Sequence, residues 1–423
     1  MLPDGNSVQT ISRVKGTQDF TDLTLYSFIV KEFEKQAQLY HFDRIETPIL
    51  ERVDLFKRSL GLETDIVSKE MFVIDTADKS EQICLRPEAT APTVRAFIEL
   101  KPITPWKVYS FGPMFRYERP QKGRFRQFHQ INMEIIGSAS IAQDAQLITM
   151  LDRFFHEKLM LNNYALQLNF LGSYEDRAAY YDVLRAYLEK IDNVCKTCLQ
   201  RKERNLMRIF DCKSDRCQEI FDKAPKIADH LSPESKKEWE KLQEDLSLLS
   251  VSFSYNPKLV RGLDYYNKTV FEFVSSDLGA QNAFCGGGRY DRLSMKLGDS
   301  KEHPALGAAI GIERLMLLLE PMKDKLSLPQ PAPLYVVMPL SGDQNPLALL
   351  LADTLHAANL ATDTLLDGDS LKSMMRKANK MGAAYALILG DEEQQNKTVL
   401  AKNMMNGQQE QVAQIDLVGY LKQ

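Results

Sequence analysis

The sequence has 423 residues, of which 44% are hydrophobic and 26% are charged. These proportions are typical of a globular protein, and no apolar run approaches the roughly 20 residues that a bilayer-spanning helix needs, so we expect a soluble protein. The formal charge of -4 gives no global sign of nucleic-acid binding, so any RNA contact has to be local. A chain of this length predicts two or three domains.

The cellular compartment is predicted from the N-terminus and the cysteines. Residues 1–15 are polar and contain no apolar segment followed by a cleavage site, so they do not resemble a secretion signal. Six cysteines in so long a chain do not form a disulfide framework, which favours a reducing compartment. We therefore expect a cytoplasmic protein.

Residues 1–173 are predicted to form the first part of the main domain. An amphipathic helix is indicated by four apolar residues on one face, after Thr21 and Asp22 as possible caps: Leu25, Phe28, Ile29 and Phe33. An extended segment ends at Pro48, and strands are predicted at 108–111 and within 125–136. In the second strand polar residues alternate with apolar ones: Arg126, Gln130, Asn132 and Glu134 against Ile131, Met133 and Ile135. This alternation predicts one face in the core and one face of hydrogen-bonding groups.

Residues 174–250 are rich in charged residues at helical spacing and are predicted to form an inserted helical module. One helix is expected to start at Ser232-Pro233, with Trp239, Leu242, Leu246 and Leu249 at helical spacing. The insert also contains four clustered cysteines: Cys195, Cys198, Cys212 and Cys217. Their spacing is compatible with a structural zinc site. The alternative is unliganded thiols, because Lys and Arg crowd this segment and the last gap is unusual.

Residues 251–327 are predicted to complete the main domain. Strand-like and glycine-rich sequence at 259–288 is followed by a helix built on 310–319, and small residues from Ala305 onward are expected to open that helix. The proline-rich residues 328–333 predict a stiff linker and a domain boundary.

Residues 334–423 predict a small α/β domain. Strands are expected at 334–338 and 385–389 and helices at 347–360 and around 371–381, which favours a mainly parallel sheet. The second helix has an outward basic face, formed by Lys372, Arg376, Lys377 and Lys380. This face could meet phosphates, or it could simply be solvated.

The densest chemical signal lies between the two predicted strands of residues 108–136. Five basic residues fall within eleven positions: Arg116, Arg119, Lys122, Arg124 and Arg126. Guanidinium groups fixed at strand ends suit a polyphosphate, and a neighbouring aromatic such as Phe125 or Phe128 can stack on a base. The alternative is an ordinary basic hairpin tip. The Gly286-Gly287-Gly288 run is neither a Walker loop nor a Rossmann fingerprint.

Several motifs carry a resemblance to a known family. Phe115-Arg-Tyr-Glu118 resembles the second signature motif of class II aminoacyl-tRNA synthetases, residues 307–314 resemble the third, and the segment around Pro48 resembles the first. Two further segments, Arg261-Gly-Leu-Asp-Tyr-Tyr266 and Gly286-Gly-Gly-Arg-Tyr-Asp291, resemble the histidine-specific signatures of histidyl-tRNA synthetases. Residues 85–91 fit as well, although Ala89 stands where glycine is more usual.

The resemblance implies a fold and an activity. The expected fold is an α+β catalytic domain with a mainly antiparallel sheet, a helical insertion and a C-terminal α/β anticodon-binding domain. The expected activity is that of a histidine-tRNA ligase, which uses ATP and Mg²⁺, without an organic cofactor, to form histidyl-adenylate and then charges tRNA(His). The family also implies a homodimer. Alternatives are a catalytically silent, synthetase-like regulatory subunit of histidine biosynthesis, or a tRNA-sensing domain of a larger regulatory protein. The first typically lacks the C-terminal domain and much of the arginine signature.

The resemblance also implies roles for individual residues. Arg116 and Arg261 are expected to hold the α-phosphate from opposite sides as the catalytic pair, and both belong to the expected histidine site. The remaining histidine-binding residues are Glu88, Thr90, Gln130, Glu134, Tyr265 and Tyr266. ATP is expected to contact Arg116, Glu118, Phe128 and Arg314. The tRNA acceptor end is expected to contact Arg119 and Gln121.

Overall fold

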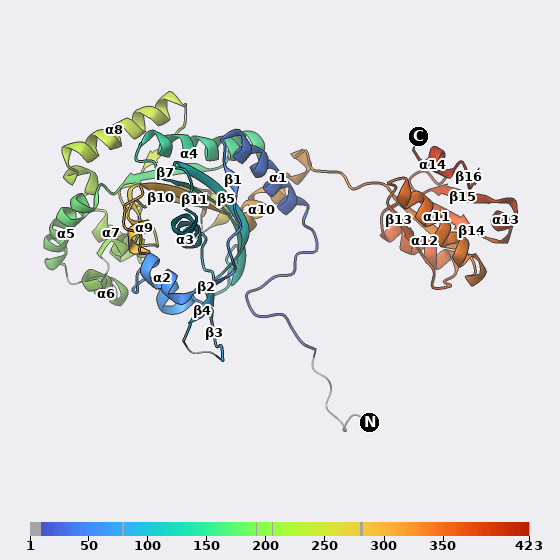
Figure 1. Cartoon of the computed structure of the whole chain (residues 1–423), viewed down its shortest axis with the longest axis horizontal. Helices are drawn as coiled ribbons and strands as arrows, with labels where there is room; N and C mark the ends of the chain where they lie inside the picture. The colour runs from blue at the N-terminus through green and yellow to red at the C-terminus, as the bar shows by residue number, and fades with distance from the viewer. Residues whose placement is uncertain (1–9, 78–79, 192, 205, 280–281, 423) are drawn as a thin grey trace, which may run out of the picture. The chain divides into compact units, whose positions relative to one another are not determined.

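The chain divides after Leu328 into two compact units, each of which is described by itself (Figure 1). The computed structural model describes residues 10–77, 80–191, 193–204, 206–279 and 282–422. Within these ranges no helix combines the length and the apolar character that crossing a membrane requires.

The first unit is built on a large, mainly antiparallel sheet. Its described strands pair in the order β1-β5-β6-β11-β10-β9-β7-β8, and only the edge pairs β1–β5 and β7–β8 are parallel. The strands are β1 (Asp43–Arg44), β5 (Trp106–Phe115), β6 (Gln127–Ile136), β11 (Ala305–Gly311), β10 (Ala283–Arg289), β9 (Asn267–Val274), β7 (Ala165–Phe170) and β8 (Ser254–Tyr255). A small antiparallel sheet is formed by β2 (Leu50–Arg52), β4 (Ile83–Leu85) and β3 (Val73–Ile74).

Helices cover both faces of the large sheet (Figure 1). One apolar core packs the sheet against α1 (Thr24–Leu39), α4 (Ala142–Arg153), α8 (Pro233–Leu248) and α10 (Ile312–Leu319). A second core lies among α2 (Val53–Leu60), α3 (Thr90–Leu100), the helices of the insert and the loop before β9. The predicted apolar face of α1 is confirmed, since Leu25, Phe28, Ile29 and Phe33 are all buried.

Strand β6 confirms the alternation predicted for it. Ile131, Met133 and Ile135 are buried in the core that contains α1 and α4. Gln130 and Asn132, on the other face, line a cavity. One strand therefore serves both the core and the candidate site.

The prediction that Ala305 opens a helix is wrong. Residues 305–311 form strand β11, and helix α10 begins only at Ile312. The small residues serve close strand packing instead. A β-carbon on Gly287 would lie 2.2 Å from the carbonyl oxygen of Gly307, and one on Gly307 would collide with the carboxylate of Glu134.

A buried ionic cluster joins the end of β10 to helix α4. The side chain of Arg289 is fully buried and forms ion pairs with Asp144 of α4 and Asp291. It also donates to the carbonyl oxygens of Ser138 at 2.7 Å and Ser140 at 3.1 Å. Because each guanidinium nitrogen has an acceptor, the buried charge is fully compensated.

Helices fill the segment between β7 and β8. They are α5 (Tyr174–Glu189), α6 (Lys196–Arg204), the 3-10 helix η3 (Leu206–Asp211), α7 (Asp215–Phe221), the 3-10 helix η4 (Ile227–His230) and α8. The predicted start of α8 is confirmed, because the Ser232 hydroxyl accepts the Ser235 N–H at 3.3 Å and Pro233 occupies the first turn. Trp239, Leu242 and Leu246 form its buried face.

The second unit is a small α/β domain. Its elements are β12 (Leu334–Pro339), α11 (Asn345–Ala357), β13 (Thr362–Thr364), α12 (Leu371–Lys380), β14 (Ala383–Leu389), α13 (Asp391–Asn396), β15 (Thr398–Asn403), β16 (Gln409–Ala413) and α14 (Leu417–Leu421). The strands pair in the order β13-β12-β14-β15-β16. The first two pairings are parallel and the last two are antiparallel, so the expected mainly parallel sheet is in fact mixed. The basic residues of α12 are exposed, and Lys377 pairs with Asp369.

Candidate functional site

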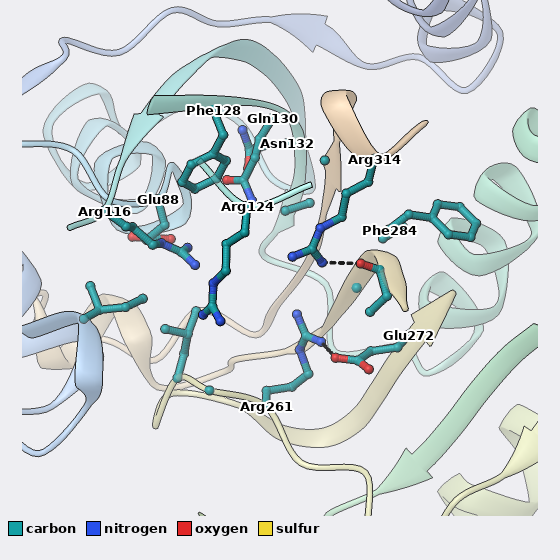
Figure 2. Close-up of a pocket in the computed structure, with 18 of the residues that line it drawn as sticks. Glu88, Arg116, Arg124, Phe128, Gln130, Asn132, Arg261, Glu272, Phe284 and Arg314 are labelled. Atoms are coloured by element: carbon teal, nitrogen blue, oxygen red, sulfur yellow. Dashed lines mark hydrogen bonds and ion pairs between the residues drawn. The ribbon is translucent and has the colours of Figure 1, made fainter. Parts of the chain in front are cut away.

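A cavity of about 310 Å³ opens on the polar face of the large sheet in the first unit. Its walls come from β6, β9, β10 and β11, the loop between β5 and β6, the start of α3, the loop before β9, and helix α10. Figure 2 shows charged side chains pointing into this space from opposite sides, with Arg314 facing Arg261 and Arg124.

One part of the cavity is acidic. The Glu88 carboxylate accepts the backbone N–H groups of Thr90 at 2.8 Å and Ala91 at 2.9 Å, which fixes it at the start of α3. The Thr90 hydroxyl donates to one carboxylate oxygen of Glu134 at 2.7 Å, and the Tyr290 hydroxyl donates to the other. Burial raises the pKa of Glu134 to about 8 and also raises that of Glu88. Both carboxyls therefore favour a cationic partner.

Two buried tyrosines stand beside these carboxyls. The ring centroids of Tyr265 and Tyr266 are 4.6 Å apart. Helix α5 of the insert holds their backbone, because Arg177 donates to the Tyr266 carbonyl at 2.6 Å and the Tyr174 hydroxyl donates to the Tyr265 carbonyl at 3.3 Å. Burial raises the pKa of both tyrosines, so their hydroxyls stay neutral hydrogen-bonding groups.

Cations gather in the rest of the cavity. Arg116 donates to the Pro87 carbonyl at 2.9 Å, and its guanidinium carbon lies 5.3 Å from the centre of the Phe128 ring. Burial, followed by repulsion from Arg124 and Arg116, lowers the pKa of Arg314 to about 10. Arg314 is held by the carbonyls of Gly123 and Ala283. Because these cations repel one another, an anion bound among them would be stabilised.

Arg261 enters the cavity from the loop before β9. Its guanidinium pairs with Glu272 of β9 and lies 5.8 Å from the centre of the Tyr266 ring. Burial alone would lower the pKa of Arg261, but the Glu272 carboxylate raises it above its ordinary value. This arginine is therefore a permanent, oriented cation.

Some buried polar atoms in the cavity have no partner among the described residues. They are the amide oxygen of Gln130, the amide nitrogen of Asn132 and the Nε of Arg261. Buried polar groups are normally hydrogen-bonded, so these atoms are available to a polar ligand.

The structure brings most of the predicted site residues to this one cavity. Those that line it are Glu88, Thr90, Arg116, Glu118, Phe128, Gln130, Arg261, Tyr265, Tyr266 and Arg314. Glu134 is buried behind Thr90 rather than on the cavity surface. Arg119 and Gln121 are exposed and are not among the lining residues.

Comparison with known proteins supplies the family. A family model for histidyl-tRNA synthetase matches residues 24–315, and a model for an anticodon binding domain matches residues 335–423. The chain belongs to the histidyl-tRNA synthetase family. The predicted resemblance and the predicted fold class are thus confirmed.

Individual members of the histidyl-tRNA synthetase family match over nearly their whole length. A histidine--tRNA ligase from Solidesulfovibrio magneticus is 41% identical over 418 residues, which cover 97% of each chain. One from Clostridioides difficile is 39% identical over 416 residues, covering 97% of this chain and 98% of the relative. The crystal structure of apo S. aureus histidyl-tRNA synthetase superposes with a TM-score of 0.79 at 31% identity, covering 98% of this chain and 100% of that one.

Sequence reasoning missed several residues of this candidate site. Glu272, the partner of Arg261, lies between Phe271 and Phe273, and a lone acid between two apolar strand residues was a usable signal. Arg208 lines the cavity from η3 of the insert, and nothing in the sequence indicated that the insert reaches the site. Asn132 was recognised as polar but was not assigned to the site.

Proposed function

We propose that the chain is a histidine-tRNA ligase, which activates L-histidine with ATP and transfers it to tRNA(His). The observation that carries the proposal is the pair Arg116 and Arg261. Both guanidinium groups line one cavity, between an acidic, tyrosine-lined part and further cations. Such an arrangement suits a reaction that joins an amino acid to a nucleoside triphosphate.

The acidic part suits histidine. In the proposal the Glu88 carboxylate meets the α-ammonium or the imidazole, while the Gln130 amide and the Tyr265 and Tyr266 hydroxyls supply hydrogen bonds. Glu134 accepts the Thr90 hydroxyl from behind, and a bound cationic ligand would favour the ionised form of its carboxyl. An amino acid without the matching polar atoms would leave these buried groups unpaired, at about 1–3 kcal/mol for each group.

The cationic part suits ATP. Phe128, beside Arg116, offers a flat surface for adenine. Arg314 is proposed to meet the terminal phosphates and Arg116 the α-phosphate. Glu118, which pairs with Arg124, is proposed to lie at the nucleotide as well. Magnesium is proposed to enter as part of MgATP, because Glu118, Glu272 and Glu313 are already paired with Arg124, Arg261 and His129.

The first step is then an in-line displacement. A histidine carboxylate oxygen attacks the α-phosphorus, the bond to the bridging oxygen breaks, and pyrophosphate leaves with the magnesium. Negative charge builds on the equatorial oxygens, where Arg116 and Arg261 neutralise it from two sides. No protein nucleophile is required, and the fixed cations supply positioning and charge.

The second step is proposed to charge the tRNA. The terminal ribose hydroxyl attacks the adenylate carbonyl and AMP leaves. Arg119 and Gln121 are exposed on the loop between β5 and β6, where they are accessible to an acceptor end. The second unit, which matches an anticodon-binding model, is proposed to bind the anticodon region of the tRNA.

Pyrophosphate exchange into ATP tests the activation step without tRNA. Each of the twenty amino acids is offered in turn with Mg²⁺, and exchange with histidine alone is the expected result. Folded protein that gives no exchange with any amino acid would contradict the proposal and favour a regulatory subunit of histidine biosynthesis. An assay for a partner enzyme would then follow.

The assembly and location are proposed from the family and the surface. A homodimer with contacts near Pro48 is supported by the neighbouring Ile49 and Leu50, which are 41% and 54% exposed. Light scattering would give about twice the mass of one chain for a dimer. A cytoplasmic location is supported by six free cysteines, which suit a reducing compartment.

A further inference from the structure

The helical insert contains a cluster of four cysteines remote in sequence from the signature motifs. Cys195 directly precedes α6 and Cys198 lies in its first turn, Cys212 follows η3, and Cys217 lies in α7. All four sulfur atoms lie within 4.8 Å of one another, and all but Cys195 are buried. None of them is in a disulfide.

We propose that these four cysteines bind a structural zinc ion. A tetrahedral site with zinc–sulfur bonds of about 2.3 Å separates its sulfur atoms by about 3.8 Å. The Sγ atoms of Cys195 and Cys212 are 3.7 Å apart. Three chain segments bring four sulfur atoms within 4.8 Å of one another and so present a closed set of ligands, as structural zinc sites do.

Backbone amides around the cluster point at the sulfur atoms. The Cys195 N–H donates to the Cys217 Sγ at 3.3 Å, and the Ser214 N–H donates to the Cys212 Sγ at 3.5 Å. Such bonds stabilise sulfur as a thiolate, the form that binds zinc after each thiol has released its proton.

The basic residues that argued against zinc in the sequence are compatible with it in the structure. Lys196, Lys213 and Arg216 are exposed next to ligand positions. Zinc with four thiolates carries a net charge of -2, so neighbouring cations would stabilise the site.

The chemical type of the four ligands indicates which metal ion the cluster would bind. Four sulfur donors within the described insert favour zinc or an iron site over magnesium or calcium. Sulfur atoms this close together surround one ion rather than a multi-iron cluster. Among single ions, zinc suits a buried site with no open coordination position and no redox role.

The site would hold one wall of the cavity in place. Cys212 directly follows η3, which carries Arg208. Arg208 lines the cavity and forms ion pairs with Asp211 at 3.1 Å and Asp65 at 3.5 Å. Zinc therefore acts as a structural element that positions this wall, and it does not touch the reacting atoms.

Metal analysis of the full chain tests the proposal. Protein purified from zinc-supplemented cells, without chelators or a metal-binding tag, should contain about one zinc per chain by mass spectrometry. Cys198→Ala and Cys212→Ala should each contain less than about a tenth of that amount. Cys84→Ala is the matched control, because it removes another buried free thiol and should keep the zinc.

A second measurement uses the wild-type chain and so does not depend on the variants folding. Chelator-treated, reduced protein titrated with Co²⁺ should develop thiolate-to-cobalt charge-transfer and tetrahedral d–d absorption that saturates at about one ion per chain. The proposal would be overturned if the wild-type protein contained little zinc as purified and also failed to develop these bands with Co²⁺. It would also be overturned if the protein contained iron in place of zinc. A Cys195–Cys198 disulfide in protein alkylated at lysis would overturn it as well.

Discussion

The guanidinium group of Arg261 lies against Gly286, at a place where a β-carbon would stand 2.6 Å from its Nη1 atom. Gly286 is paired across the sheet with Glu272, whose carboxylate forms the ion pair with Arg261. The arginine is thus oriented by a charge on one strand and by the lack of a side chain on the next.

A Gly286→Ala substitution should therefore reduce activity more than stability. The added methyl group meets only the end of a flexible side chain, which can move away, so the loss of stability should stay below about 1 kcal/mol. Displacing the guanidinium should lower histidine-dependent pyrophosphate exchange about 100-fold. Urea denaturation and exchange assays on the same preparation would check both. A variant with normal exchange would show that Arg261 is not needed in this position.

The neighbouring Gly287→Ala should behave in the opposite way. Its β-carbon would lie 2.2 Å from the Gly307 carbonyl oxygen, and a backbone atom cannot move without shifting strand β11. We expect a loss of about 3 kcal/mol in unfolding free energy, measured by urea denaturation. Stability equal to that of Gly286→Ala would contradict the close packing of β10 and β11.

Arg261→Lys should fold normally and fail in adenylate formation. A lysine keeps the charge next to Glu272 but cannot hold two phosphate oxygens with one planar group. Pyrophosphate exchange should fall by about 100- to 1,000-fold. Arg185→Lys, an exposed arginine on α5, is the matched control and should leave exchange unchanged. Near-normal exchange in Arg261→Lys would remove the central role given to this residue.

Histidine binding should release a proton from Glu134. Because burial raises the pKa of Glu134 to about 8, the carboxyl is mostly protonated at pH 7 in the free protein. A bound ammonium group favours the ionised carboxylate and lowers that pKa, so affinity should rise with pH towards 8, by up to about tenfold per unit. Calorimetry in buffers of different ionisation enthalpy measures the released proton. Glu134→Gln should abolish the release, and a wild-type chain that releases none would refute the coupling.

Arg119 and Gln121 should affect only the tRNA step. Both are exposed and outside the cavity, so Arg119→Ala and Gln121→Ala should leave pyrophosphate exchange unchanged. Charging of tRNA(His), followed with labelled histidine, should fall about 10-fold or more. Equal losses in exchange and charging would assign these residues to activation instead.

The sequence predicted correctly those elements whose formation depends on residues close to one another in the chain. The apolar spacing of α1, the cap of α8 and the two-residue alternation of β6 each depend on neighbours in the sequence, and each was confirmed. The density of arginines around Arg116 predicted an anion site; the binding of an anion stays a prediction, and Arg116 and Arg124 line the cavity.

Features that depend on long-range pairing were not predictable. Small residues at 305–311 are compatible with a helix as well as a strand, and only their position between β6 and β10 decides for the strand. The pairing of Arg261 with Glu272 depends on the register of β9 and β10, and the approach of Arg208 depends on the fold of the insert. The function itself came from the resemblance of motifs, because charge and spacing alone also fitted a basic hairpin.

The buried cluster around Arg289 changes how loss-of-function data on this chain should be interpreted. Arg289 follows the glycines of the site directly in sequence, yet its side chain faces Asp144 and has no exposed surface. Truncating Arg289 would leave the buried carboxylates of Asp144 and Asp291 without their cation, which would lower the free energy of unfolding by several kcal/mol. A genetic screen scored by growth would therefore rank Arg289 with Arg261, although Arg261 is proposed to act on the reactants and Arg289 only keeps the scaffold intact. Soluble yield, measured alongside growth, would separate the two.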